Sequence, residues 1–130
     1  MDEPIVYVDR SEIREGKLDE LKEALGELVE FVHTHEPQLL SYGFYIDDTG
    51  TRMTLVAVHP DSASLELHME IAGPAFRNFT HLVNLLSIEI YGRPSERVLE
   101  QLRGKARLLG TGEHPVVDRL HAGFWRDTFR

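Results

Sequence analysis

Apolar residues recur along the first part of the chain at two spacings, one typical of a strand and the other of a helix. Residues 4–10 alternate loosely and are rich in β-branched side chains, which predicts a first strand. Residues 17–36 carry an apolar residue every three or four positions, which predicts a helix with one buried face. The stripe on that face consists of Leu18, Leu21, Leu25, Leu28 and Val32. Gly26 interrupts this helix and suggests close packing against a strand, and Pro37 ends it.

The middle of the chain predicts a hairpin of two strands, residues 39–47 and 51–59. Residues 47–50 have the sequence Asp-Asp-Thr-Gly, which is typical of a hairpin turn. Period-two alternation places Tyr42 and Phe44 on the same face of the first of these strands. The second strand is apolar on both faces towards its end, so we expect both faces to be covered.

A second helix is predicted for residues 61–72, with Asp61 as its N-cap. One histidine, His68, falls on the apolar face of this helix at helical spacing from Leu65 and Ala72. We therefore expect its imidazole to point inward with the hydrophobic side chains.

A Gly-Pro pair breaks the second helix and starts a new turn at Pro74. Phe76 and Phe79 share a face of that turn, and residues 86–91 predict a fourth strand. The resulting order, βαββαβ, predicts an α+β protein with a ferredoxin-like sheet and helices on one face.

The end of the chain predicts a further helix and strand. Residues 94–109 form an amphipathic pattern, and Gly110 is the expected C-cap. The inward positions are Val98, Leu102, Ala106 and Leu109. Residues 114–126 predict a fifth strand, which would extend the sheet or cross to a partner subunit.

We expect a single domain over residues 1–130, with its core in residues 4–92 and an extension in residues 93–130. The net charge of −8 argues against nucleic-acid binding, because an acidic surface repels phosphate. The absence of cysteine excludes disulfides and thiolate metal sites. The sequence shows neither the pattern of a signal peptide nor an apolar stretch long enough to span a membrane. We therefore expect a cytoplasmic protein without a membrane partner.

Two histidines close to the end of the first helix, His33 and His35, are candidate metal ligands. Helical residues two positions apart point in different directions, so the two imidazoles cannot easily share one ion. We predict no metal site and expect both side chains to lie at the helix end, where the dipole favours a cation. A His33–Glu36 pair with a distant third ligand is the alternative.

His68 is the candidate catalytic residue, because an inward imidazole titrates near neutral pH and can transfer a proton. The simpler interpretation is a core histidine whose ring nitrogens are satisfied by neighbours. His59 stands on the same strand face as apolar residues and could converge with His68 across the gap between helix and sheet. Its simpler interpretation is a strand-end residue that reaches water.

Four more residues are candidates for binding a small molecule beside these histidines. Tyr42, Phe44 and Phe76 offer aromatic surface, and the tyrosine hydroxyl can bond a ligand carbonyl, although strand tyrosines mainly pack. Arg77 follows the Gly-Pro break and could bind a ligand carboxylate or enolate, although a surface ion pair is commoner.

These segments together resemble the antibiotic biosynthesis monooxygenase family of the dimeric α/β-barrel superfamily. The matching features lie in order along the first 92 residues. They are Gly16-Lys17 before the first helix, Glu36-Pro37 after it, Tyr42 in a strand, Asp61, Ala63 and His68 in the second helix, and Phe76 and Phe79 in the following turn.

The resemblance implies a homodimer whose sheets face each other and a pocket for a small aromatic, polyketide-type or quinone-type molecule. The implied function is a cofactor-independent monooxygenase, an oxidoreductase in which His68, helped by Tyr42 or His59, removes a substrate proton. No cofactor is predicted. The haem-degrading relatives carry an asparagine in the first strand and a tryptophan that have no counterpart here, which disfavours haem; flavin is disfavoured as well.

Two departures from the family pattern keep other functions open. The family usually has a glutamate where this chain has Ala57 and an aromatic residue where it has His59. One alternative is a non-catalytic domain of the same fold that binds a small molecule or serves assembly. A weaker alternative is a haem-binding protein with His68 as axial ligand.

Overall fold

The computed structural model describes residues 3–110 and 114–126. Nine elements follow one another within these described residues. They are β1 (Ile5–Ile13), α1 (Leu18–His35), β2 (Ser41–Ile46), β3 (Arg52–His59), α2 (Ser62–Ala72), the 3₁₀ helix η1 (Gly73–Phe79), β4 (Val83–Tyr91), α3 (Glu96–Leu109) and β5 (Val116–Asp118). The βαββαβ order and the added helix and strand confirm the predicted sequence of elements.

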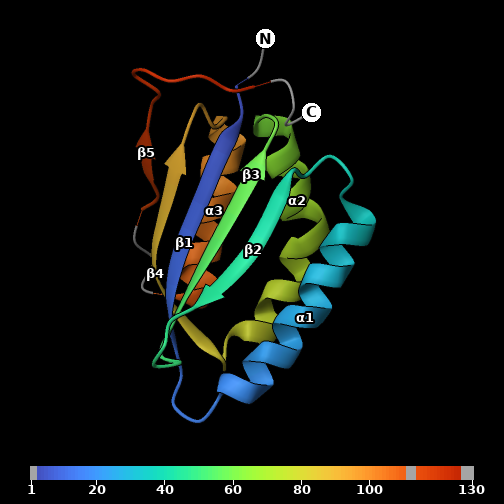
Figure 1. Ribbon diagram of the computed structural model, residues 1–130, viewed down its shortest axis with the longest axis vertical. Coiled ribbons are helices and arrows are strands. Elements are labelled where there is room, and N and C mark those ends of the chain that lie inside the picture. The colour runs from blue at the N-terminus through green and yellow to red at the C-terminus, as the bar shows by residue number, and fades with distance from the viewer. Residues whose placement is uncertain (1–2, 111–113, 127–130) are drawn as a thin grey trace.

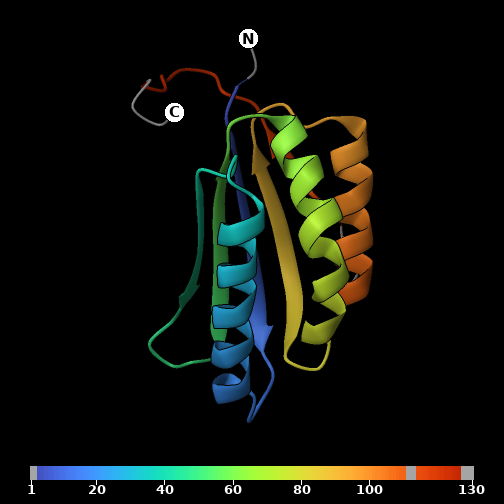
Figure 2. The same ribbon diagram turned by 90° about the vertical axis from the view of Figure 1, so that its right-hand side faces the viewer.

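The strands form one five-stranded sheet in the order β2-β3-β1-β4-β5. The central strand β1 pairs antiparallel with both β3 and β4, and β5 joins the edge of β4 in parallel. The three α-helices lie on one face of this sheet (Figures 1 and 2). The predicted α+β, ferredoxin-like architecture is therefore confirmed.

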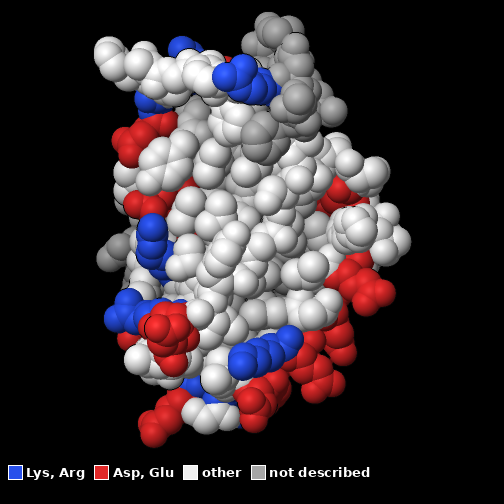
Figure 3. All heavy atoms as spheres, in the orientation of Figure 1, with Lys and Arg blue, Asp and Glu red and all other residues white. Residues whose placement is uncertain are grey.

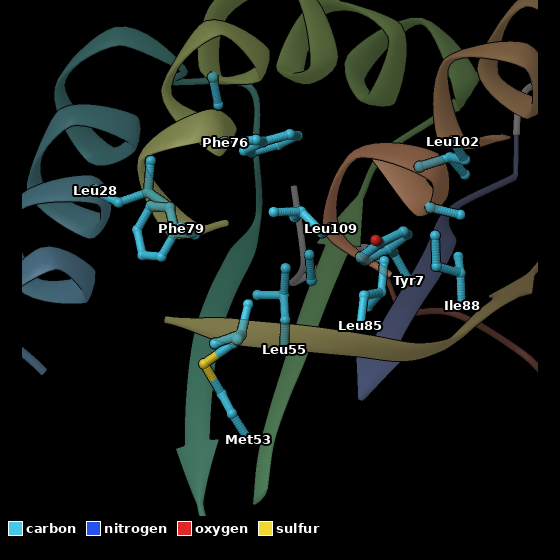
Figure 4. Close-up of a cluster of buried hydrophobic side chains, with 14 of the residues drawn as sticks. Tyr7, Leu28, Met53, Leu55, Phe76, Phe79, Leu85, Ile88, Leu102 and Leu109 are labelled. Atoms are coloured by element: carbon cyan, nitrogen blue, oxygen red, sulfur yellow. The ribbon is translucent and has the colours of Figure 1, made fainter. Parts of the chain in front are cut away.

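The helix-facing residues of β1 alternate with outward ones, as the pleat of a strand requires. The buried set is Ile5, Tyr7, Asp9, Ser11 and Ile13. Figure 4 shows apolar side chains of the sheet pointing towards those of the helices. Asp9 and Ser11 thus place polar groups inside a core that is otherwise largely hydrophobic.

The predicted apolar stripe of α1 is largely confirmed, because Leu21, Leu25, Leu28 and Val32 are buried. The prediction for Gly26 is wrong. A Cβ atom added at this glycine would meet nothing within 4 Å, and the residue lies on the exposed side of the helix. Its position one residue after Leu25 turns it about 100° away from the buried stripe.

Asp61 caps α2 as predicted, because its carboxylate accepts a hydrogen bond of 2.9 Å from the backbone N–H of Ser64. His68 is 3% exposed, so the prediction that it points inward is confirmed. After the Gly-Pro break, the short η1 helix buries Phe76 and Phe79 against the same core.

The C-terminal helix α3 buries its predicted inward residues and ends at the predicted C-cap Gly110, but it begins at Glu96, after Ser95 as N-cap, and not at Pro94. The fifth strand was predicted for residues 114–126, but β5 pairs over only three residues. The reason is geometric: β5 runs parallel to β4 and meets it at Glu89 to Tyr91, where β4 ends. Of the residues that follow Asp118, those that the structure describes, 119–126, form no strand.

The other face of the sheet is not covered by helices. Outward side chains of its central strands, such as Val8 and Val56, are partly exposed, and Tyr45 on β2 is 64% exposed. In Figure 3 most of this face is uncharged, and charged side chains gather towards its margins. Among the described residues, no helix is both long enough and apolar enough to cross a membrane.

Two glycine substitutions test the packing at the end of α3 and along α1, and we expect them to change the unfolding free energy in opposite directions. Gly110→Ala would bring a Cβ atom to 2.1 Å from the carbonyl oxygen of Leu85, so we expect a loss of about 1–3 kcal/mol in unfolding free energy. Gly26→Ala fills open space in a helix, so we expect a gain of about 0.5–1 kcal/mol. Urea unfolding of both variants measures these changes, and a destabilised Gly26→Ala would contradict the packing of α1.

Candidate functional site

A small cavity lies between the sheet and the helices and has a volume of about 30 Å³. That volume holds about two water molecules. Most of its wall is apolar, and the three charged or hydroxyl-bearing aliphatic side chains that line it are Asp9, Ser11 and Lys105. The predicted ligand-binding residues Tyr42, Phe44 and Phe76 line it as well. The remaining lining residues are Leu25, Leu28, Met53, Leu55, Phe79, Val83, Leu85 and Leu109.

A buried ion pair forms part of the cavity wall. Lys105 of α3 donates to Oδ2 of Asp9 on β1 at 2.8 Å, although both residues are less than one tenth exposed. Tyr7 donates to the same Oδ2 at 2.6 Å and accepts from Lys105 Nζ at 2.9 Å. Burial, and next the charge of Asp9, raises the pKa of Tyr7, so its phenol stays neutral.

The sequence predictions did not include this cluster. Lys105 lies three residues after Leu102 and four before Leu109, within the apolar stripe of its helix. Asp9 lies two residues after Tyr7, on the buried face of its strand. A charged residue at a buried position of a regular pattern is the signal that could have identified each one.

A second buried polar pair joins α1 to α2. The Glu36 carboxylate accepts from Nδ1 of His68, with 2.8 and 2.9 Å to its two oxygens. Glu36 is the C-cap residue of α1, and its side chain is fully buried. This contact engages Nδ1 and leaves Nε2 as the second ring nitrogen of His68.

Tyr42 stands between the two polar clusters. Its ring lies edge-on to His68, with 5.2 Å between the ring centroids, and it also lines the cavity. Burial, and then the charges of Asp9 and Glu36, raises the pKa of Tyr42 well above its usual range. Its hydroxyl is therefore a neutral group within electrostatic reach of both carboxylates.

His59 lies close to His68, with 5.6 Å between ring centroids, but neither histidine is part of the cavity wall. The expectation that His59 reaches water is wrong, because the residue is completely buried. The cap at Asp61 folds α2 back over the end of β3, and the Ser64 hydroxyl meets Nδ1 of His59 at 2.8 Å. Burial, and then the charge of His68, lowers the pKa of His59 to about 3.

The other predicted residues lie outside the cavity. Arg77 is exposed and is not part of the cavity wall. His33 and His35 are both exposed in the last turn of α1, where His35 Nδ1 donates to the Phe31 carbonyl at 2.8 Å. Within residues 3–110 and 114–126, no three histidine or carboxylate side chains are arranged to hold a metal ion.

A wider groove of about 470 Å³ opens between α1, α2 and η1. Leu28 and Phe79 line both this groove and the inner cavity. These two side chains therefore separate the surface groove from the space that Lys105 lines.

The fold of this chain is similar to that of several solved structures. No family model matches the sequence, and no curated protein matches it significantly. Among solved structures, MupZ from Pseudomonas fluorescens is 24% identical with a TM-score of 0.75, over 98% of each chain. SnoaB from Streptomyces nogalater, a cofactor-independent oxygenase, is 14% identical with a TM-score of 0.60, over 73% of this chain and 96% of its own.

A third structure, of a proposed antibiotic biosynthesis monooxygenase from Bacteroides thetaiotaomicron, is 18% identical with a TM-score of 0.58, over 72% of this chain and 90% of its own. The chain thus has the fold of the antibiotic biosynthesis monooxygenase-like proteins, and the resemblance predicted from the sequence is confirmed at that level. The match to MupZ spans nearly the whole chain, so it includes most of α3, the helix that carries Lys105.

The neutral, buried His59 gives a testable pH dependence. The unfolded chain takes up a proton at this histidine near pH 6.5, whereas the folded protein does so only near pH 3. Between these values the unfolded state binds more protons, so acidification should cost about 1.4 kcal/mol of stability per pH unit from this group.

We expect His59→Asn to remove that part of the pH dependence, as measured by urea unfolding across the acid range. The exposed His33→Asn variant is the matched control and should keep the wild-type slope. Identical slopes in wild type and His59→Asn would contradict a neutral His59.

Proposed function

We propose that the protein is a cofactor-independent monooxygenase that acts on a small aromatic, polyketide-type or quinone-type molecule held between the sheet and the helices. The observation that carries this proposal is the buried Glu36–His68 pair beside Tyr42, a residue of the cavity wall. A carboxylate bonded to one ring nitrogen fixes the imidazole and stabilises it when the other nitrogen accepts a proton.

In this reaction the substrate carries an acidic methylene group conjugated to a carbonyl. Tyr42 takes a proton from that carbon and at the same time passes its own hydroxyl proton to His68. The raised pKa of Tyr42 disfavours a phenolate, so the phenol transfers the proton onward and stays neutral. The resulting carbanion gives an electron to O₂, and the two radicals combine into a peroxide anion, which takes back the proton held by His68. The peroxide loses water and leaves a new carbonyl, so one oxygen atom stays in the product and no external reductant is required.

The apolar wall of the cavity suits this chemistry. Met53, Leu55 and the two phenylalanines of η1 exclude water, which would otherwise protonate the carbanion before O₂ reaches it. A substrate larger than two water molecules requires Phe79 to move, and the adjoining groove offers the space from which it would approach. The fold shared with SnoaB, a cofactor-independent oxygenase, supports a reaction without a cofactor.

The same proposal includes a homodimer formed through the uncovered face of the sheet. Partly exposed valines of β1 and β3 occupy its centre, and few charges lie there (Figure 3). Large uncharged faces of this kind mark interfaces between protein chains. Two sheets packed face to face would also cover the second apolar face of β3.

Oxygen consumption tests the reaction. With dithranol, a phenolic tricyclic ketone that has an acidic methylene, we expect the wild-type protein to take up one O₂ per product molecule. His68→Gln retains a donor for Glu36 but cannot accept a proton, so we expect its rate to fall by about a hundred-fold or more. His68→Ala should lose at least as much, and the exposed His33→Gln should not change the rate.

An unchanged rate in folded His68→Gln and His68→Ala would refute the role of His68. Wild-type protein that binds dithranol but takes up no oxygen would refute the monooxygenase and favour a non-catalytic binding domain. Circular dichroism of each variant separates lost chemistry from lost folding.

Native mass spectrometry tests the dimer. We expect wild-type protein at twice the mass of one chain, and Val56→Lys at the mass of a single chain because it places a charge in the apolar face of the sheet. The matched control is Val29→Lys on the exposed side of α1, which should stay dimeric. Wild-type protein at the mass of one chain would exclude the proposed interface.

A further inference from the structure

We infer that Lys105, held by Asp9 and Tyr7, binds an anionic oxygen of the ligand, and that the ligand is an enol, a phenol or an enolisable ketone. The site is built by a residue of α3, a helix that lies beyond the βαββαβ core. The inference deepens the proposed function, because it names the group that stabilises the product of proton removal. It can nevertheless be tested by ligand binding without turnover.

The geometry leaves Lys105 one hydrogen-bond donor to spare. An ammonium group has three N–H donors. Two of them are directed to Asp9 Oδ2 and Tyr7 Oη, at 2.8 and 2.9 Å. Among the residues that the structure describes, no other side chain or backbone group accepts from Nζ. Because Lys105 lines the cavity, a ligand oxygen there can take the third donor.

The aromatic surroundings hold the ammonium group at the cavity wall. Its Nζ lies 4.6 Å from the ring centroid of Phe76 and 4.9 Å from that of Tyr7. These ring faces attract a cation and favour its present position. A donor that is already held in place costs little reorganisation when negative charge develops on a ligand, which is how oxyanion-binding groups act.

A contribution to folding stability does not by itself explain why Asp9 and Lys105 form a buried ion pair. Removing two charges from water costs about as much as their attraction returns, and well-packed apolar residues can often replace a buried ion pair without loss. Here the pair borders a cavity rather than filled core, and it faces a ligand space that is otherwise mostly hydrophobic. A few convergent polar groups in an apolar pocket are typical of a site that orients a ligand.

The position of the pair also complements the proposed proton transfer. The group that accepts the proton, His68, is bonded to Glu36, whereas Lys105 is bonded to Asp9. Tyr42 lies within the electrostatic reach of both carboxylates. When a proton leaves the ligand carbon towards His68, the charge that remains moves onto the conjugated oxygen, and Lys105 is the cation that lines the cavity to receive it.

Para-nitrophenol is the probe, because its absorption spectrum distinguishes the phenolate from the neutral phenol. We expect wild-type protein to bind it and to raise the phenolate fraction at a given pH. Nitrobenzene has the same nitro-substituted ring without the hydroxyl group and controls for apolar contact. Single removal of Lys105 would leave Asp9 buried without its cation, so the test variant is the double change Asp9→Asn with Lys105→Met.

We expect the double variant to fold, to bind nitrobenzene as the wild type does, and to bind nitrophenolate about ten-fold or more weakly. The increase in phenolate fraction should disappear. A purely structural role for the ion pair would leave that spectrum unchanged, so equal phenolate fractions in wild type and double variant would overturn the inference.

The variant Phe79→Ala tests whether access to the cavity limits binding, because it removes one of the two side chains that line both the groove and the cavity. If neither wild type nor Phe79→Ala binds nitrophenolate more tightly than nitrobenzene, the inference is also overturned. Nitrophenolate binding that depends on Lys105, in a protein that binds dithranol but takes up no oxygen with it, would retain this site and refute the monooxygenase.

Discussion

The ion pair between Asp9 and Lys105 connects β1, the central strand of the sheet, to α3, the last helix among the described residues. Each charge is removed from water, so neither can lose its partner without a large cost in free energy. This requirement fixes α3 over β1 and keeps Tyr7 within hydrogen-bond distance of both charges. The cavity exists beside that contact, with one wall from the sheet and the other from α3, η1 and α1.

A second buried contact, from Glu36 to His68, connects the other two helices in the same way. Tyr42 relates the two contacts: its ring lies 5.2 Å from that of His68 between centroids, and the charges of both carboxylates raise the pKa of its phenol. In the proposed reaction the Glu36–His68 pair gains a proton while Lys105 gains an oxyanion. The positive charge on His68 and the negative charge on the ligand oxygen would thus form at separate places, both away from water. Electrostatic interactions are stronger in such a site than in water, because the dielectric constant is lower.

Local patterns in the sequence were sufficient to predict the elements and the direction of one key side chain. The stripe of α1, the cap at Asp61 and the inward position of His68 all follow from residue spacing, because the helix period decides which side chains share a face. The length of β5 could not be predicted in this way. It depends on where β4 ends, which is a property of the assembled sheet.

The candidate site was predicted only in part, for a related reason. Tyr42, Phe44 and Phe76 were assigned to a pocket and do line the cavity. The partners of the polar groups were missed, since Asp9 and Lys105 are 96 residues apart and Glu36 and His68 are 32 apart. No local pattern encodes such a pairing. Lys105 in an apolar stripe and Asp9 on a buried strand face were nonetheless visible as exceptions to their patterns.

A crystal structure of the protein with para-nitrophenol bound tests the central claim most directly. The expected result is a phenolate oxygen within hydrogen-bond distance of Lys105 Nζ, with the aromatic ring against Phe76 and Tyr42. Displacement of Phe79 from its contact with the inner cavity should accompany binding. A probe bound at the surface, with the Asp9–Lys105 pair and the cavity unchanged, would contradict the assignment of this cavity as the ligand site.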